Sequence, residues 1–509
     1  MSDVNWTITI HDEERLTAKY QEGGKKQSVT AVGKLGRGTN LARLTVERLN
    51  RWLNYSISKQ EEKRRGESPC ELDDLKVLGL NLSEIIFGDE STRIGEEQDS
   101  IKEQFTRHYK RFDPKDPNSH LRLRLIFEKG AARLAGLPWE FLFVSPNDEI
   151  GDGFFIAGQK SQLTLTRFVP ESKLIKDLKP LQEKKLKILL ICSNPQDLGE
   201  SIDTKVVAEV ESRLNDLRSV EVKKFDNQTF EQLRKLIHED FCPRVVHFIG
   251  HGKEGKLALV KSPEDHDYDR TLADEDRKVQ ARWIDMDDMR KLFADRGLRL
   301  IFLHACKGAT ATTLDGFKST AGYLADLRIP AVVAMQYNIF NEDAGIFART
   351  FYEEIGKGKD IDEAVEAGRV KLNDQMPAWY PRFGTPVVYL HSNEAAIISP
   401  GAAGDDGKGR KKGKPKRGAE MQPQPAKPEV STGGVESAAN VLRELSPEQL
   451  KALGFERHVA TKESRPVQQR PAAEKELPTP KGDVTGALGT PDTGADTRAF
   501  EAASSKGKN

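Results

Sequence analysis

Cysteine is scarce in this 509-residue chain, and its few copies stand far apart. The sequence has four cysteines and no CxxC pair, which argues against a disulfide framework and against a structural zinc ribbon. We therefore expect reduced thiols and no metal site. The four residues are Cys70, Cys192, Cys242 and Cys306.

Segments that direct a chain to a membrane are also lacking. The first residues, MSDVNWTITIHDEERL, contain no basic stretch followed by an apolar one, as a secretory signal would. No run approaches the roughly 18 consecutive apolar residues of a membrane-spanning helix. We expect a cytoplasmic protein that does not insert into a membrane by itself.

Neither sign of charge is in excess, because 79 Lys and Arg residues balance 79 Asp and Glu residues. Such a chain has no net field to attract nucleic acid or an anionic lipid surface. One basic run, GKGRKKGKPKRG at 407–418, has no aromatic residue among its charges, which favours a solvated linker over a nucleic-acid site. We predict no nucleic-acid partner.

Aromatic residues nearly disappear from about residue 399 onward, where Phe455 and Phe500 are the only ones. Gly, Pro, Ala, Ser and charged residues dominate this region, and such a composition buries too little apolar surface to fold. We expect 399–509 to be a disordered tail. Within it, 435–455 places apolar residues near helical spacing, which predicts a short helical segment able to dock on a partner.

Alternating strands and helices are what the middle of the chain does contain. Their spacing indicates an α/β fold with a mainly parallel, doubly wound sheet sandwiched by helices. The predicted strands cover 186–191, 220–225, 245–249, 298–303 and 331–335, and the predicted helices cover 202–217, 230–237, 319–327, 342–355 and a segment that Asp360 opens.

The first 180 residues have a different pattern. Helical spacing occurs at 41–53 and 72–87, while apolar and polar residues alternate at 120–128 and 163–167, which is typical of half-exposed strands. A prior of about 150 residues per domain suggests several units. We divide the chain into an N-terminal α/β or α+β accessory or sensor unit, a main domain and the tail, at 1–180, 181–398 and 399–509.

Two strings in the main domain carry the chemistry. RVVHFIGHGKEG and LRLIFLHACKGAT each run through a predicted strand and end in small residues around one reactive side chain, His251 and Cys306 respectively. Because ligands bind at the carboxyl ends of parallel strands, these ends can bring an imidazole beside a thiol, as a cysteine nucleophile requires. The small residues that leave room for a peptide backbone are Gly250, Gly252, Ala305 and Gly308.

A thiol nucleophile sets further demands. A free thiol with a pKa near ~8.5 is mostly protonated at neutral pH, so a base such as His251 must favour the thiolate. The backbone N–H groups of Gly252 and Cys306 could then stabilise the oxyanion of a tetrahedral intermediate. The reaction needs neither a metal nor an organic cofactor.

Other interpretations of the cysteines stay open. Cys306 can be a buried core thiol, since cysteine is among the most buried residue types, and His251 can be a turn residue. Cys192 also ends a predicted strand but has no adjacent His-Gly pair. Cys242 begins a strand, which places it at the wrong edge of the sheet for this chemistry.

Two more histidines, His247 and His304, lie inside the predicted strands. A core or supporting role suits them better than direct chemistry. A zinc site that combines them with His251 and Cys306 is conceivable, because His and Cys are preferred zinc ligands, but strand geometry disfavours it.

Two other segments have simpler interpretations. In GLPWEFLF (136–143) we interpret Trp139 as an aromatic packed under the sheet and Glu140 as a carboxylate bonded to backbone. The segment 261–282 is long and charged, so we expect a mobile loop that could gate access to the site or contact an activator.

The most distinctive strings are HFIGHG (247–252), LHACKGA (303–309), LPWEF (137–141) and the segment 329–369. Together they resemble the CHAT family, caspase-like peptidases related to caspases and separases, over about residues 120–392. The two reactive side chains are 55 residues apart, near the spacing of that clan. The tandem repeats that often accompany the family, with a period of about 34 residues, are missing.

This resemblance implies a caspase-like fold, with the N-terminal unit as an accessory or pseudo-caspase part. It implies Cys306 as the nucleophile and, of the two histidines in HFIGHG, His251 as the general base and acid. Asn194, Gln336 and Asp343 are the positions that it suggests for the substrate cleft.

The activity that the resemblance implies is a cysteine endopeptidase. It would make limited cuts in a protein partner, controlled by a protein or ligand activator, in bacterial signalling or defence. A catalytically silent caspase-like scaffold for protein–protein interaction is the alternative. The cleavage preference stays open, because Asp315, Glu342 and Asp343 would favour Lys or Arg if they line the pocket, and an apolar pocket fits equally well.

Overall fold

The computed structural model describes most of the chain between residues 3 and 397, all within the first of two units into which the chain divides, Met1–Glu456. The predicted tail at 399–509, with its helical segment 435–455, lies outside the described residues, as do Cys306 and most of the predicted helix 319–327. The described residues are 3–23, 29–34, 39–62, 72–88, 93–94, 99–116, 118–145, 153–168, 175, 178–198, 202–253, 255–271, 279–305, 324, 327, 329–337, 339, 341–374, 382–392 and 397.

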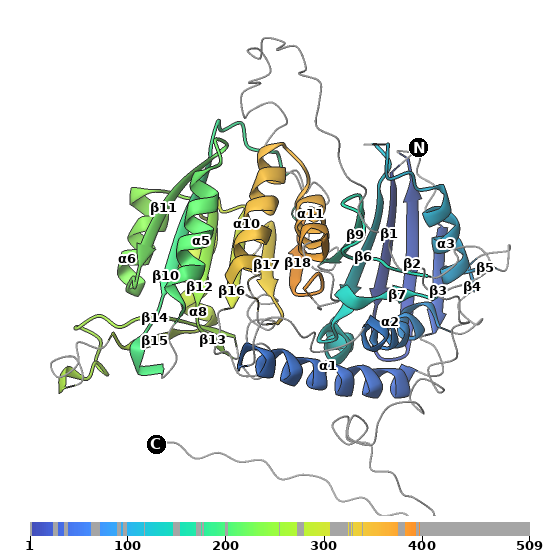
Figure 1. Ribbon diagram of the computed structural model, residues 1–509, viewed down its shortest axis with the longest axis horizontal. Helices are drawn as coiled ribbons and strands as arrows, with labels where there is room; N and C mark the ends of the chain where they lie inside the picture. Colours follow the sequence, from blue (N-terminus) through green and yellow to red (C-terminus); the bar gives the residue numbers. More distant parts are fainter. Residues whose placement is uncertain are drawn as a thin grey trace, which may run out of the picture. The chain divides into compact units, whose positions relative to one another are not determined.

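One eleven-stranded sheet runs through the described residues (Figure 1). Neighbouring strands are parallel except at three pairings, β17 with β18, β1 with β2, and β2 with β3. In sheet order the strands are β11 (Val220–Asp226), β10 (Leu186–Ser193), β12 (Val245–Gly250), β16 (Leu300–Ala305), β17 (Ala331–Met335), β18 (Pro386–Leu390), β9 (Leu163–Phe168), β6 (Leu121–Phe127), β1 (Val4–Ile10), β2 (Arg15–Glu22) and β3 (Val29–Lys34).

Mostly apolar runs form the inner strands β12, β16 and β17 of the C-terminal half, because a parallel strand covered on both faces buries every side chain. β12 and β17 are buried along their whole length. Every strand predicted between 186 and 335 is present and parallel to the others in this group. The predicted mainly parallel sheet with flanking helices is therefore confirmed.

Four of the predicted helices of this half are present, as α5, α6, α10 and α11, whereas α8 was not predicted. Figure 1 shows α5, α10 and α11 side by side along the sheet, and α10 contacts both of the others. The helical segments are α5 (Thr204–Asn215), α6 (Phe230–Lys235) with a π-turn at Leu236–Asp240, α8 (Met286–Phe293), α10 (Asn341–Gly356), α11 (Ile361–Asp374) and a 3-10 turn at Gln196–Leu198.

The N-terminal half adds its own strands and helices to the same sheet. The predicted helices at 41–53 and 72–87 correspond to α1 and α2, and α3 begins at a capping box in which Ser100 and Glu103 bond reciprocally. Its remaining elements are α1 (Thr39–Glu62), α2 (Leu72–Phe87), α3 (Ile101–Arg111), α4 (Ala132–Ala135), 3-10 turns at Lys129–Ala131 and Trp139–Phe141, and the short strands β4 (Arg93–Ile94), β5 (Asp99–Ser100), β7 (Phe143–Val144) and β8 (Phe154–Phe155).

The prediction that β6 and β9 are half-exposed is wrong. All six residues of β9 are buried, and Arg122 of β6 is only 7 % exposed. Arg122 binds carboxylates of Asp360 and Asp362 at 3.1 Å, while the Arg124 guanidinium lies 4.7 Å from the Phe168 ring centroid. The alternating basic residues thus face internal partners rather than water.

Two hydrophobic clusters share the sheet. One joins β1 and β6 to α1, α2 and α3, and the other joins the strands from β10 to β17 to their helices. Strand β18 pairs with β17 on one side and with β9 on the other, so the sheet is continuous across residue 180. The division of the chain at that residue stays a prediction.

A small antiparallel sheet follows β12 directly. It contains β13 (Gly252–Lys253), β14 (Lys256–Val260) and β15 (Ala281–Ile284). The segment that links β14 to β15 carries ion pairs, with Lys261 2.9 Å from Asp267 and Arg282 3.3 Å from Asp265. Its role as a gate or activator contact stays a prediction. In the described part of the chain, no helix has the length and apolar character needed to cross a membrane.

Candidate functional site

The two strands that carry the reactive strings are neighbours. β12 and β16 pair in parallel, with Gly250 opposite Ala305. Both strands therefore end at the same level of the sheet, as predicted from the sequence. His251 follows Gly250 directly, and Cys306, the next residue after Ala305, lies outside the described residues.

The register extends this level to the flanking strands. Ser193 of β10 lies opposite Gly250, and Leu303 of β16 lies opposite Ala334 of β17. Gln336 is the first residue after β17, which ends at Met335. The carboxyl ends of these four parallel strands thus lie at one edge of the sheet, where the row of residues that directly follow the strands contains Asn194 after β10, His251 after β12 and Gln336 after β17.

The backbone at His251 is held by the small antiparallel sheet. The Ala258 N–H donates to the His251 carbonyl at 3.0 Å, and the Ser193 hydroxyl donates to the Ala258 carbonyl at 2.7 Å. Only glycine fits at 250, because a Cβ there would lie 2.4 Å from the Phe248 ring. The half-buried His251 therefore stands on a fixed turn at the end of β12.

His247 and His304 are core residues. They are 0 % and 1 % exposed, and the His247 ring stacks on Phe302 with centroids 4.2 Å apart. Burial lowers the pKa of His304 to about 4, and burial together with the neighbouring His304 lowers the pKa of His247 well below its usual 6.5. Among the described residues, neither ring nitrogen of His304 has a hydrogen-bond partner.

The lowered pKa values of these two histidines predict that the folded protein loses stability in acid. In the unfolded chain His304 takes up a proton near pH 6.5, whereas in the folded chain it does so only near pH 4. The free energy of unfolding therefore decreases as the pH falls from about 6.5 to about 4. The slope is up to about 1.4 kcal/mol per pH unit for each histidine. In His304→Leu we expect a shallower fall between pH 7 and pH 5, measured by chemical denaturation.

The control for this pH experiment is His266→Gln, which alters an exposed imidazole and is expected to leave the slope unchanged. A His304→Leu protein whose stability falls as steeply as that of the wild type would contradict the expectation.

Cys192 is a poor candidate for the nucleophile. Burial and the nearby Asp226 raise the pKa of its thiol to about 11, so the thiolate is scarce at neutral pH. Cys242 is exposed at the end of the π-turn, and its thiol donates to the His238 carbonyl at 3.5 Å. Neither residue lies in the row beside His251.

Two of the residues predicted for the cleft make structural contacts. The Asn194 side-chain oxygen accepts the Ile202 N–H at 2.9 Å. Arg382 donates to the Asp343 carboxylate at 2.9 Å, and Asp343 is buried at 4 % exposure. Asp315 lies outside the described residues. That Asn194 and Asp343 shape a substrate cleft stays a prediction.

Glu140 has different partners from those predicted. Its carboxylate accepts two bonds from Arg167, at 3.0 and 2.7 Å, and one from the Gln336 amide at 2.8 Å, so side chains rather than backbone hold it. Burial alone would raise the pKa of Glu140, but the Arg167 charge and hydrogen bonds outweigh burial and lower it. Trp139 is fully buried, as predicted, and its indole N–H donates to the Leu134 carbonyl.

The described residues do not include a metal centre. Nowhere among them do three or more His, Cys, Asp or Glu side chains gather in a way that could hold an ion. The zinc alternative requires Cys306, which is not described, so it gains no support here.

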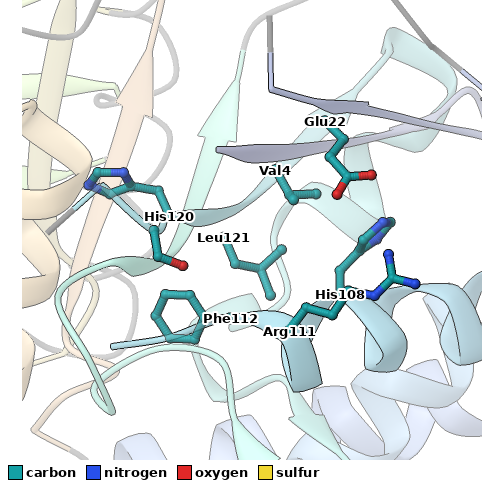
Figure 2. A pocket seen from close by; sticks show the side chains of 8 residues that line it. Val4, Glu22, His108, Arg111, Phe112, His120 and Leu121 are labelled. Atoms are coloured by element: carbon teal, nitrogen blue, oxygen red, sulfur yellow. The ribbon is translucent and has the colours of Figure 1, made fainter. Parts of the chain in front are cut away.

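A small hollow opens elsewhere, at the first residues of β1 and β6 (Figure 2). The His108 ring at its wall accepts the Trp6 indole N–H at 3.0 Å, and burial lowers the pKa of this imidazole. None of the predicted site residues lines it. The lining residues are Val4, Glu22, His108, Arg111, Phe112, Ser119, His120 and Leu121.

Comparison with protein families gives one match. Residues 105–392, more than half of the chain, match the CHAT domain. The chain belongs to the CHAT domain family. The match begins within the unit predicted for residues 1–180. It therefore includes β6 and β9 of the N-terminal half as well as the strands of the C-terminal half. No curated protein matches the chain.

Solved structures with a similar arrangement share little sequence with this CHAT chain. The separase of Saccharomyces cerevisiae, in complex with securin, is 13% identical with a TM-score of 0.40; the match covers 75% of this chain and 30% of the separase chain. RgpB of Porphyromonas gingivalis, with its pro- and mature domains, is 12% identical with a TM-score of 0.34, covering 60% and 71%. Caspase-1 of Spodoptera frugiperda is 14% identical with a TM-score of 0.28, covering 45% and 96%.

Proposed function

We propose that this CHAT protein is a cysteine endopeptidase that uses Cys306 and His251. The observation that carries the proposal is the parallel pairing of β12 and β16 with Gly250 opposite Ala305. Adjacent strands lie about 4.8 Å apart, and each following Cα is about 3.8 Å further along the chain. An imidazole and a thiol that follow these two residues can therefore reach hydrogen-bond distance.

The chemistry follows from these two groups. The Cys306 thiolate attacks the scissile carbonyl and forms a C–S bond, and the His251 imidazolium gives its proton to the leaving amine as the C–N bond breaks. His251 then takes a proton from water, which attacks the thioester, and the thiol is released with the acid product. No cofactor enters the balance.

Gly252 is suited to stabilise the oxyanion. Because the Ala258 N–H bonds to the His251 carbonyl, the next pair, Gly252 opposite Leu257, is a non-hydrogen-bonded pair of the antiparallel ladder. In such a pair the N–H points away from the partner strand. The Gly252 N–H and that of Cys306 are the proposed donors.

The proposed substrate is a protein, cut at few sites and under the control of a protein or ligand activator. The family resemblance suggests bacterial signalling or defence as the setting. The half-buried position of His251 and the charged segment between β14 and β15 fit an access route that a partner can regulate.

Labelling by a peptidyl electrophile tests the proposal. We expect the wild type and Cys192→Ala to be labelled at one thiol, identified by peptide mapping as Cys306, and Cys306→Ala to remain unlabelled. Cys192→Ala is the matched control because it removes the other thiol that ends a strand of this sheet. Equal labelling of the wild type and Cys306→Ala would instead favour a catalytically silent scaffold.

A further inference from the structure

We propose that Glu140 is a positioning residue for the segment that follows β17. The buried charge of Glu140, in the N-terminal half of the chain, sets the geometry of the sheet edge at which His251 stands. This inference rests on the proposed function and names a residue pair, Glu140 and Gln336, through which that site is aligned.

Gln336 is fixed by bonds from both its backbone and its side chain. Its backbone N–H donates to the Thr385 carbonyl at 2.9 Å, and its side-chain amide donates to Glu140 at 2.8 Å and to the Gly384 carbonyl. Both acceptors lack a proton to give, so the amide nitrogen must face them. Gln336 is only 1 % exposed, which leaves it little freedom to turn.

The anchor behind Gln336 is itself rigid. Glu140 is fully buried against Arg167 in a two-bond pair, which is the strongest common form of charge-assisted hydrogen bonding. The same guanidinium donates to the Ala135 carbonyl at 2.8 Å and to the Leu137 carbonyl at 3.0 Å. A continuous set of hydrogen bonds thus runs from the LPWEF string to Gln336, the residue that follows β17.

The next residue, Tyr337, is held by a separate hydrogen bond. Tyr337 is fully buried, and its hydroxyl donates to the Asn50 side chain of α1 at 2.5 Å. The N-terminal half of the chain therefore holds both residues of this segment, Gln336 through Glu140 and Tyr337 through Asn50. This segment directly follows β17, the strand that pairs with β16, and the proposed nucleophile directly follows β16 in the sequence.

Space is tight around this contact. A Cβ on Gly384 would lie 2.3 Å from the Phe141 ring, and the Phe141 ring centroid is 5.9 Å from that of Tyr337. A shift of Glu140 therefore moves Gln336 and Tyr337 rather than being absorbed by a gap. A displacement of about 1 Å near reacting groups can cost on the order of 100-fold in rate.

A set of exchanges at the two positions tests the inference. Gln336→Glu sets two carboxylates against each other, and Gln336→Met removes the amide with little change in size. The exchanged pair, Glu140→Gln with Gln336→Glu, restores one donor facing one acceptor. The matched control is Asp362→Asn, which alters another buried acid that pairs with an arginine and whose partners are Arg122 and Thr164.

Two readouts are measured on folded full-length protein, kcat and KM for peptide cleavage and hydrogen exchange of the Gln336 amide. We expect kcat to fall at least about tenfold in Gln336→Glu and Gln336→Met with KM within about threefold, and the Gln336 amide to exchange faster. The exchanged pair should recover part of both losses. Asp362→Asn should change neither.

The outcomes separate the inference from the proposed function. Folded variants with unchanged kcat and unchanged exchange overturn the positioning role, as does a loss of thermal stability alone. Should the wild type cleave no peptide, the proposed function fails, while the exchange rate of the Gln336 amide still decides whether Glu140 holds this segment.

Discussion

Replacing His251 with alanine is expected to lower kcat for peptide cleavage by on the order of 10³-fold. The imidazole would have to activate the thiol and protonate the leaving amine, and alanine can do neither. The fold should survive, because the Ala258 N–H bonds to the carbonyl of residue 251 at 3.0 Å, which alanine retains. The loss of rate would therefore report on the side chain alone.

The measurement is steady-state kinetics across pH. In the wild type, kcat/KM should depend on the ionisation of an acid and a base, and His251→Ala should lose the limb that belongs to the imidazole. His266→Ala, which changes an exposed histidine of the neighbouring loop, is the control and should stay within about twofold. A His251→Ala protein within about tenfold of the wild type contradicts the assignment of the base.

The sequence predicts the C-terminal half of the sheet well because its signals are local. A fully buried parallel strand needs an unbroken apolar run, and 331–335 has one that coincides with β17. The helical spacing of 72–87 coincides with α2. The pairing of β12 with β16 follows from the same pattern, since both strands end in small residues around a reactive side chain.

Features that depend on distant residues are the ones that the sequence misses. The alternation in β6 suggests a solvent-exposed face, but Arg122 donates to Asp362, 240 residues away in the sequence. The basic residue therefore belongs to an internal cluster of charged side chains. Likewise, no local pattern shows that Gln336 donates to Glu140. A single arginine in the otherwise uncharged strand LTLTRF was the available signal for the Glu140 partner.

The features of the candidate site also divide into those that the sequence predicts and those that it does not. The level of His251 in the sheet could be predicted, because strand ends define it. The pairing of Leu303 with Ala334 could not, because it depends on the register between β16 and β17. A register cannot be derived from apolar runs that are buried on both faces, since a shift by one residue exchanges apolar residues for other apolar residues.

Replacing Arg167 with methionine is expected to destabilise the protein by about 3 to 5 kcal/mol, because removing one partner of a buried ion pair leaves an uncompensated charge. Arg167 and Glu140 are 1 % and 0 % exposed, so water cannot replace the lost partner. The measurement is the free energy of unfolding from chemical denaturation. The exposed pair of Arg234 with Glu231 provides the control, and Arg234→Ala should change stability by less than about 1 kcal/mol.

The pH dependence gives this prediction a sign. In the wild type, the pKa of Glu140 is lowered in the folded state, so the pair contributes stability above about pH 4.5 that is lost as the pH falls. In Arg167→Met, burial dominates and raises that pKa, so protonation at mild acidity relieves the unpaired charge. The deficit relative to the wild type should therefore be larger at pH 7 than at pH 5.

Adding Glu140→Gln to Arg167→Met removes the charge altogether and should recover most of the loss of stability at pH 7. A double variant as unstable as Arg167→Met would show that the cost arises from packing.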